Sequence, residues 1–305
     1  GATVDDAEQF VGDDGDGLSM VFQFEHVEVG QDGGKWSAGD WSLVEFKRIL
    51  AKWQNGLEDD GWNSLYLNNH DQPRMVSRYG DDERYRRRSA KLLGTLTHTL
   101  QGTPFVYQGE ELGMTNADFE SKAELRDVEA INYVESAVED GEATAYEDVR
   151  EAVETVGRDN ARTPMQWTDG EHAGFTDGEP WIKVNENHET VNVERARSDP
   201  ASVWQYYRDL VALRHESDLL VYGSFDLLYP DHPELFAYER HLDGERALVV
   251  LNVSDTATTF EAPDGVAVDG LELALANVEA PAVPRSTVAL DPYEARVYLS
   301  TDAAD

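Results

Sequence analysis

His70 and Asp71 lie side by side in the segment YLNNHDQPR (66–74), after an apolar run and just before Pro73. Because Pro73 prevents the chain from continuing as a central strand, the pair is expected to follow a strand end. His70 and Arg74 place donors on either side of the Asp71 carboxylate. A cationic neighbour favours an ionised Asp, which suits stabilising positive charge or binding hydroxyl groups better than donating a proton. Taken alone, the spacing favours an ordinary turn in which Asp71 caps a helix.

Two further acidic segments could take part in acid–base or metal chemistry. Glu110 and Glu111 are adjacent in YQGEELG, and retaining glycosidases use two carboxyl groups about 5 Å apart. Loop contacts or a solvated face are the commoner roles for such a pair, and we favour them here. Glu25 and His26 could bind a metal, but no second pair stands at ligand spacing, so the sequence predicts no metal site.

Arg158 and Arg162 stand four residues apart in GRDNARTPMQW. Guanidinium groups hold hydroxyl or carboxylate groups in a fixed orientation. The surrounding stretch, 157–185, is rich in Gly, Asp, Thr and Pro, and it is too long for a simple connector, which suggests a lid over a binding site. Three aromatic residues near these motifs could face a sugar, although each is individually more often a packing residue: Tyr107, Trp167 and Phe175.

Strands and helices are expected to alternate around these motifs. Apolar, β-favouring residues predict strands at 18–26, 62–68 and 103–109. Helices are predicted at 42–58, with Ser42 as N-cap and Glu45 completing a capping box, and at 82–101. This alternation favours parallel βα units whose polar motifs gather at the C-terminal ends of the strands, where α/β proteins place their active sites.

From about residue 219 the pattern changes to short alternating runs separated by Gly, Asp and Pro turns. Such runs predict an antiparallel β-domain. The expected division is therefore 1–217 for the α/β part and 218–305 for the β-domain.

The charge of the chain restricts its partners. It has 61 acidic and 25 basic residues, a net charge of −36, so nucleic acid and anionic membranes are unsuitable partners. Aromatic content of 10 % within clear periodic patterns argues against disorder. We expect a surface suited to high salt and a salt-accumulating cytoplasm. No apolar run is long enough for a membrane span, and the start GATVDDAEQF has no signal-peptide pattern.

In combination these motifs carry a family resemblance. MVFQFEH, NNHDQPR, GTPFVYQGEELGMTN and GRDNARTPMQW occur in an order and at separations that resemble the C-terminal part of a glycoside hydrolase family 13 α-glucosidase of the oligo-1,6-glucosidase type, in the α-amylase superfamily. The resemblance covers nearly the whole chain. It implies an α/β fold: the C-terminal portion of a (β/α)8 TIM barrel, about strands 6–8, followed by an antiparallel β-domain.

The resemblance also implies roles for individual residues. Asp71 would be the carboxylate that stabilises the transition state, and His70 would bind the same glucose unit. Arg158 would contact the terminal glucose with Arg162 beside it, and Arg74 belongs to the same substrate-binding set. The implied activity is retaining hydrolysis of terminal α-glucosidic bonds in short malto- or isomalto-oligosaccharides, without a cofactor.

One part of the family pattern is expected to lie outside this chain. The family's nucleophilic Asp and acid/base Glu follow the fourth and fifth strands, and GATVDDAEQF resembles the segment just after that Glu. We therefore expect the chain alone to be inactive and to require the N-terminal half of the barrel as a partner. Alternatives are a non-catalytic sugar-binding or assembly subunit, or part of an isomerase that transfers the glucosyl unit.

Overall fold

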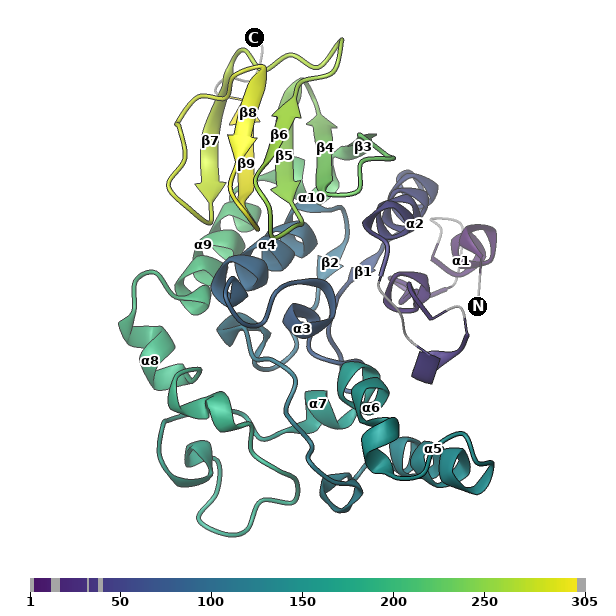
Figure 1. The fold of residues 1–305 in the computed structure, drawn as a ribbon. Coiled ribbons are helices and arrows are strands. Elements are labelled where there is room, and N and C mark those ends of the chain that lie inside the picture. Colours follow the sequence, from purple (N-terminus) through teal and green to yellow (C-terminus); the bar gives the residue numbers. More distant parts are fainter. Residues whose placement is uncertain (1–2, 12–16, 32, 38–40, 301–305) are drawn as a thin grey trace.

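The computed structural model describes residues 3–11, 17–31, 33–37 and 41–300 (Figure 1). Residues 1–2 of the segment GATVDDAEQF lie outside the described residues. Helix α1 (Val4–Val11) begins at the fourth residue of this segment. No described helix combines the length and apolar character that crossing a membrane requires.

Three neighbouring segments run parallel at the centre of the molecule. Strand β1 (Ser64–Leu65) pairs with β2 (Thr103–Pro104), Ser64 opposite Thr103. On the other side of β1, Val21 forms an isolated parallel bridge with Asn63. The order of the predicted strands is therefore as expected, but each is much shorter. The first is reduced to this bridge and ends in a 3-10 turn, η1 (Glu25–Val27).

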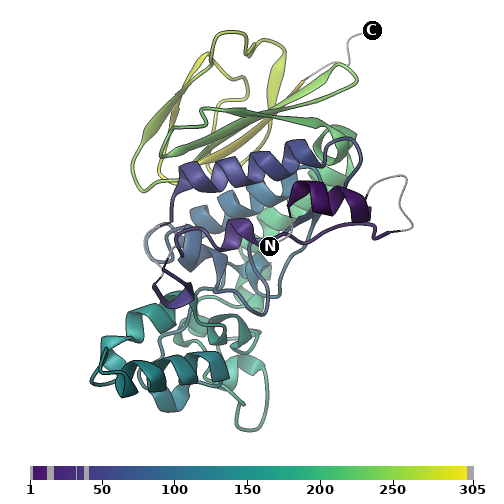
Figure 2. The same ribbon diagram turned by 90° about the vertical axis from the view of Figure 1, so that its right-hand side faces the viewer.

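Helices α2 (Leu43–Gly56) and α4 (Arg86–Thr99) confirm the two predicted helices. Ser42 begins α2 as expected, because its hydroxyl accepts from the Glu45 amide at 3.3 Å. The apolar stripe of α2, including Phe46 and Leu50, is buried in a core shared with α4 and the C-terminal sheet. Figure 2 shows both helices layered beneath that sheet.

The remaining helices fill the ends of this layer and the region opposite the sheet. Figure 1 shows α5 and α6 at the end of the molecule away from the C-terminal sheet. The α-helices are α3 (Met75–Tyr79), α5 (Val128–Glu139), α6 (Arg150–Val156), α7 (Asp159–Arg162), α8 (Val193–Ser198), α9 (Val203–His215) and α10 (Asp218–Tyr222). The short 3-10 turns are η2 (Lys35–Ser37), η3 (Glu110–Leu112), η4 (Lys122–Glu124), η5 (Tyr146–Asp148), η6 (Glu171–Gly174) and η7 (Glu186–Glu189).

The C-terminal part is antiparallel, as predicted. One sheet has the order β3-β4-β5-β9-β7, and β6 pairs with β8 in a second, smaller sheet. The strands are β3 (Ser224–Leu228), β4 (Leu235–Leu242), β5 (Glu245–Asn252), β6 (Thr258–Glu261), β7 (Leu271–Ala276), β8 (Thr287–Leu290) and β9 (Ala295–Ser300). The larger sheet buries one face against α2 and α4 and the other against β6 and β8, so its central strands are apolar on both faces. Helix α10 leads directly into β3, and the division at 217/218 stays a prediction.

A buried lysine joins the two parts. Lys47 of α2 donates to the carbonyl oxygens of Tyr229, His232 and Leu235 at 2.7, 2.7 and 2.8 Å. Burial lowers its pKa to about 8. These three bonds fix α2, and the strands it covers, against the C-terminal domain.

Candidate active site

Two asparagines set the conformation of the loop that follows β1. The Asn69 side-chain oxygen accepts from the Asp71 amide at 2.7 Å, and the Asn68 oxygen accepts from the Met75 amide at 2.7 Å. The Asn69 contact is an Asx turn, and the Asn68 contact ties the start of the loop to the first residue of α3. The loop thus presents His70 and Asp71 beyond the C-terminal end of β1.

The Asp71 carboxylate lies between two arginines. Its Oδ1 is 2.7 Å from a terminal nitrogen of Arg162 and 3.5 Å from a terminal nitrogen of Arg158. The other oxygen, Oδ2, is 3.2 Å from His70 Nε2. The Asp71 side chain remains 45 % exposed and that of His70 72 % exposed, so a ligand can reach both. The structure therefore brings together four of the five site residues predicted from sequence.

Arg158 connects this cluster to helix α5. Its Nε lies 3.0 Å from Asp127 Oδ2 and its Nη2 lies 2.5 Å from Asp127 Oδ1, so the two side chains form a bidentate ion pair. Asp127 also caps α5 by accepting from the Glu129 amide at 3.0 Å. Burial opposes ionisation of Asp127, but the hydrogen bonds from Arg158 and from the Glu129 amide outweigh it and lower its pKa. The same ion pair raises the pKa of Arg158, which holds its charge beside Asp71.

Arg74 lies behind this cluster. Its side chain is 1 % exposed and donates to the carbonyl oxygens of Gln108, Asn160 and Ala161 at 2.6, 3.2 and 3.3 Å. Burial lowers its pKa to about 10, and the guanidinium stacks over the Tyr107 ring. This position does not suit the predicted contact with a sugar, because all the surrounding space is filled by protein. Arg74 instead joins the loops after β1 and β2 to α7.

Glu110 lies beneath the loop after β1 and supports it. Its carboxylate accepts from Asn68 Nδ2 at 2.9 Å and from the Tyr207 hydroxyl at 2.8 Å. Burial raises its pKa to about 7, although these hydrogen bonds oppose the shift. Glu111 accepts from the Gly109 amide at 2.9 Å. Both glutamates make loop contacts, the role that the sequence favoured over an exposed acid–base pair.

His26 and Glu25 are engaged in contacts with other protein groups. His26 is buried, and its Nε2 lies 2.7 Å from the carbonyl oxygen of Tyr66. Burial lowers the His26 pKa to about 4, so the imidazole is neutral. Glu25 pairs with Lys52. Among the described residues, no group of three His, Cys, Asp or Glu is placed to hold a metal ion.

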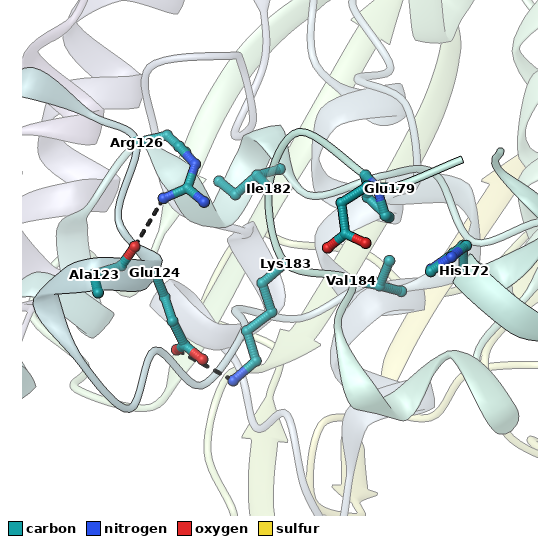
Figure 3. A pocket seen from close by; sticks show the side chains of 9 residues that line it. Ala123, Glu124, Arg126, His172, Glu179, Ile182, Lys183 and Val184 are labelled. Carbon is teal, nitrogen blue, oxygen red and sulfur yellow. Dashed lines mark hydrogen bonds and ion pairs between the residues drawn. The ribbon is translucent and has the colours of Figure 1, made fainter. Parts of the chain in front are cut away.

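The stretch 157–185 contributes exposed rings and one side of a pocket. Trp167 and Phe175 are 48 % and 46 % exposed. The pocket has a volume of about 370 Å³, and its charged lining includes Glu124 at the end of η4, Arg126 just after it, and Glu179 and Lys183 near the end of the stretch (Figure 3). Lys183 lies 3.4 Å from Glu124, and Arg126 donates to the Ala123 carbonyl at 2.9 Å. None of the site residues predicted from sequence lines this pocket, and a lid role for the stretch stays a prediction.

Sequence reasoning missed three residues that position the site: Asn68, Asn69 and Asp127. A signal for each is visible in the sequence. The Asn68–Asn69 pair directly follows the apolar run of a strand, where Asx turns are common. Asp127 precedes the amphipathic stretch that begins at Val128, the position of an N-cap.

The family relationship is clear from sequence profiles. The profile described as "Alpha amylase, catalytic domain" matches residues 1–223. A second profile, described as "Maltogenic Amylase, C-terminal domain", matches residues 225–297. Together they account for almost the whole chain in the order that the fold shows.

Individual relatives agree with the profiles. The chain is 47 % identical over 300 residues to an oligo-1,6-glucosidase of Bacillus cereus, covering 98 % of this chain and 53 % of that protein. It is 49 % identical over 286 residues to an oligo-1,6-glucosidase of Parageobacillus thermoglucosidasius, covering 92 % and 50 %. The chain thus spans about half the length of the curated relatives that it matches.

Solved structures show the same fold. The crystal structure of Bacillus licheniformis trehalose-6-phosphate hydrolase superposes with a TM-score of 0.94 at 40 % identity, over 98 % of this chain and 55 % of that one. Isomaltulose synthase from Klebsiella sp. LX3 gives a TM-score of 0.92 at 38 % identity, over 98 % and 54 %. The chain therefore belongs to the α-amylase family of glycoside hydrolases, glycoside hydrolase family 13.

Proposed function

We propose that this chain supplies the sugar-binding, charge-stabilising wall of a retaining α-glucosidase that acts on terminal glucose units of short malto- or isomalto-oligosaccharides. The observation that supports this most directly is the Asp71 carboxylate, which is half exposed and has Oδ1 facing both Arg158 and Arg162. Oligo-1,6-glucosidases among its relatives suggest the substrate class.

Each site residue has a defined task in this proposal. A carboxylate fixed by guanidinium groups is suited to accept hydrogen bonds from the hydroxyl groups of a glucose ring and to stabilise developing positive charge at the anomeric carbon. His70, the most exposed member, offers a ring nitrogen to the same sugar. In this proposal the bond-breaking pair lies outside this chain, as the family resemblance implies. Of the nearby carboxylates, Asp127 is only 1 % exposed and Glu129 pairs with both Lys35 and Arg158.

We further propose that the missing half of the barrel covers the open face of the parallel strands, which would be barrel strands 6–8. Parallel sheets are normally covered on both faces. Here helices cover one face, whereas Phe22, Phe24 and Phe105 are 45 %, 51 % and 40 % exposed. The rings of Phe22 and Phe105 lie 4.8 Å apart, and Phe22 also contacts Tyr66. Such an aromatic surface suits the interior of a closed barrel. The relatives are about twice as long as this chain, which leaves enough additional sequence for the remaining strands.

Two alternatives remain distinct from this proposal. Similarity to isomaltulose synthase raises glucosyl transfer within the same family. A non-catalytic subunit that binds sugar would retain the Asp71 cluster but have no nucleophile in its partner.

The decisive experiment compares the chain alone with the chain joined to whatever coding region lies in frame upstream. Maltose, isomaltose, sucrose and a nitrophenyl α-glucoside serve as substrates, and NMR reports the anomer of released glucose. We expect no turnover by the chain alone, and α-glucose first from the joined protein. Turnover by the chain alone that Asp71→Asn abolishes would refute the proposed division of labour.

The same assay separates the alternatives. Conversion of sucrose into an isomer without glucose release would identify a transferase. Sugar binding without turnover in the joined protein, or the lack of any upstream barrel-coding region, would favour the non-catalytic subunit.

A further inference from the structure

Three unpaired polar atoms belong to residues that line one small interior cavity. Among the described residues, Gln23 Oε1, Trp53 Nε1 and Ser64 Oγ are buried side-chain atoms without a hydrogen-bond partner. All three residues line a cavity of about 20 Å³ between α2, α4 and the parallel strands. A buried polar group without a hydrogen-bond partner is destabilising, so three such groups around one cavity point to a shared partner.

The neighbouring histidine determines which end of the Gln23 amide is free. His26 Nε2 lies 2.7 Å from the Tyr66 carbonyl oxygen, which can only accept, so Nε2 carries the proton. In the neutral ring Nδ1 is then an acceptor, and the Gln23 Nε2 group, 2.6 Å away, donates to it. The Gln23 oxygen is therefore an acceptor that still requires a donor.

These three atoms set the chemistry of the partner. The Trp53 indole N–H can only donate and the Gln23 oxygen can only accept, while the Ser64 hydroxyl can do either. A metal ion cannot accept from the indole, and a simple anion cannot donate to the amide oxygen. A water molecule does both, and it needs roughly 10–15 Å³ of space with two to four polar partners. We propose that this cavity is the binding site of one structural water that bridges Trp53, Ser64 and Gln23.

The water would complete a polar connection through the layer beneath the candidate active site. The connection runs from Trp53 of α2 through the water to Gln23, then through His26 to the Tyr66 carbonyl. Tyr66 stands four residues before His70 in the loop that carries the site. The water thus ties α2 to the strand ends that position this loop. This inference does not depend on the proposed glucosidase activity.

Removal of the Ser64 hydroxyl tests the proposal, because the direction of the change in Tm differs with and without a bound water. If the hydroxyl bonds to a water, Ser64→Ala removes a hydrogen bond and lowers Tm by roughly 2 °C. If the hydroxyl has no partner, the same change removes an unpaired polar group and leaves Tm equal or higher. Ser89→Ala is the matched control, because the buried Ser89 hydroxyl accepts from the Asp81 amide at 2.9 Å. It should lower Tm in either case.

Direct detection uses the Trp53 indole proton of the whole chain. Water-selective NOE and ROE spectra should show a cross-peak between this proton and a long-lived water. The cross-peak should persist in Ser64→Ala, which excludes relay through the exchangeable hydroxyl. A lower Tm for Ser64→Ala together with a persistent cross-peak supports the water site. An unchanged or higher Tm, or no cross-peak at Trp53, overturns it.

Discussion

Arg162 holds both residues of the His70–Asp71 pair with one guanidinium group. A terminal nitrogen donates to Asp71 Oδ1 at 2.7 Å, while Nε donates to the carbonyl oxygen of His70 at 2.9 Å. The first bond orients a side chain and the second fixes the main chain one residue earlier. Arg162 therefore sets the position as well as the direction of the Asp71 carboxylate.

Replacing Arg162 with Lys should weaken catalysis by the joined enzyme without unfolding it. Lysine keeps the positive charge but cannot form two bonds in a fixed fork. We expect kcat/KM to fall at least about tenfold, equivalent to about 1.4 kcal/mol. The control is Arg48→Lys, because Arg48 pairs with the exposed Asp231 of the C-terminal part, away from the Asp71 cluster. Equal activity of the Arg162 and Arg48 variants would contradict the positioning role.

Replacing Arg74 with Met should reduce stability. The substitution removes the Arg74 donor from the Gln108 carbonyl and one of two donors from the carbonyls of Asn160 and Ala161, which still accept from the Thr163 and Tyr107 hydroxyls. We expect the free energy of unfolding to fall by about 3 kcal/mol, measured by urea denaturation. Arg162→Met serves as control and should cost less, because its guanidinium is partly exposed. Native stability with loss of sugar binding in Arg74→Met would instead support a direct sugar contact.

Local patterns predicted the elements whose causes are local. The α2 helix was predicted from its apolar stripe and from Ser42, whose hydroxyl caps the helix by accepting from the amide three residues later. The antiparallel domain follows from alternating runs and turn residues. The family resemblance assigned Asp71 and Arg162 to one binding site, although they lie 91 residues apart in the sequence. Hydrophobic periodicity could not have predicted that these two residues are close.

Contacts between distant segments were not predictable in this way. Tyr207, which donates a hydrogen bond to Glu110, lies 97 residues further along the chain. No sequence pattern around Glu110 predicts this contact. The predicted strand at 18–26 has β-favouring composition, yet a strand requires partners along its length. Within the part of the chain that the structure describes, this segment pairs only through the bridge between Val21 and Asn63. Arg74 likewise sits in a motif rich in site residues, and only its burial separates it from them.

Glu110 should make stability depend on pH in a defined window. Its pKa is raised from 4.5 to about 7 in the folded chain, so the folded state binds a proton more tightly than the unfolded state. The resulting stabilisation is complete below pH 4.5 and is lost as pH rises through 7. Glu110→Gln removes this titration. The difference in unfolding free energy between the two proteins should therefore change by about 3 kcal/mol between pH 4.5 and 7.5.

The comparison with Glu110→Gln also removes opposing contributions. Burial lowers the pKa of His26 and of His98 to about 4, so their stabilising effect is present above pH 6.5 and lost as pH falls through 4. Both proteins carry these histidines, and their effects cancel in the difference. Parallel stability curves for the two proteins would show that Glu110 has no raised pKa.

Salt should stabilise the chain through its charge. With 61 acidic and 25 basic residues the net charge is −36, and the folded state brings these charges close together. The screening length falls from about 10 Å at 0.1 M salt to about 3 Å at 1 M. Tm should therefore rise steadily with KCl between 0.1 and 2 M. Sucrose at matched osmolality is the control, because it favours burial without screening charge. An equal gain in sucrose, or a Tm indifferent to KCl, would show that self-repulsion is not what limits stability.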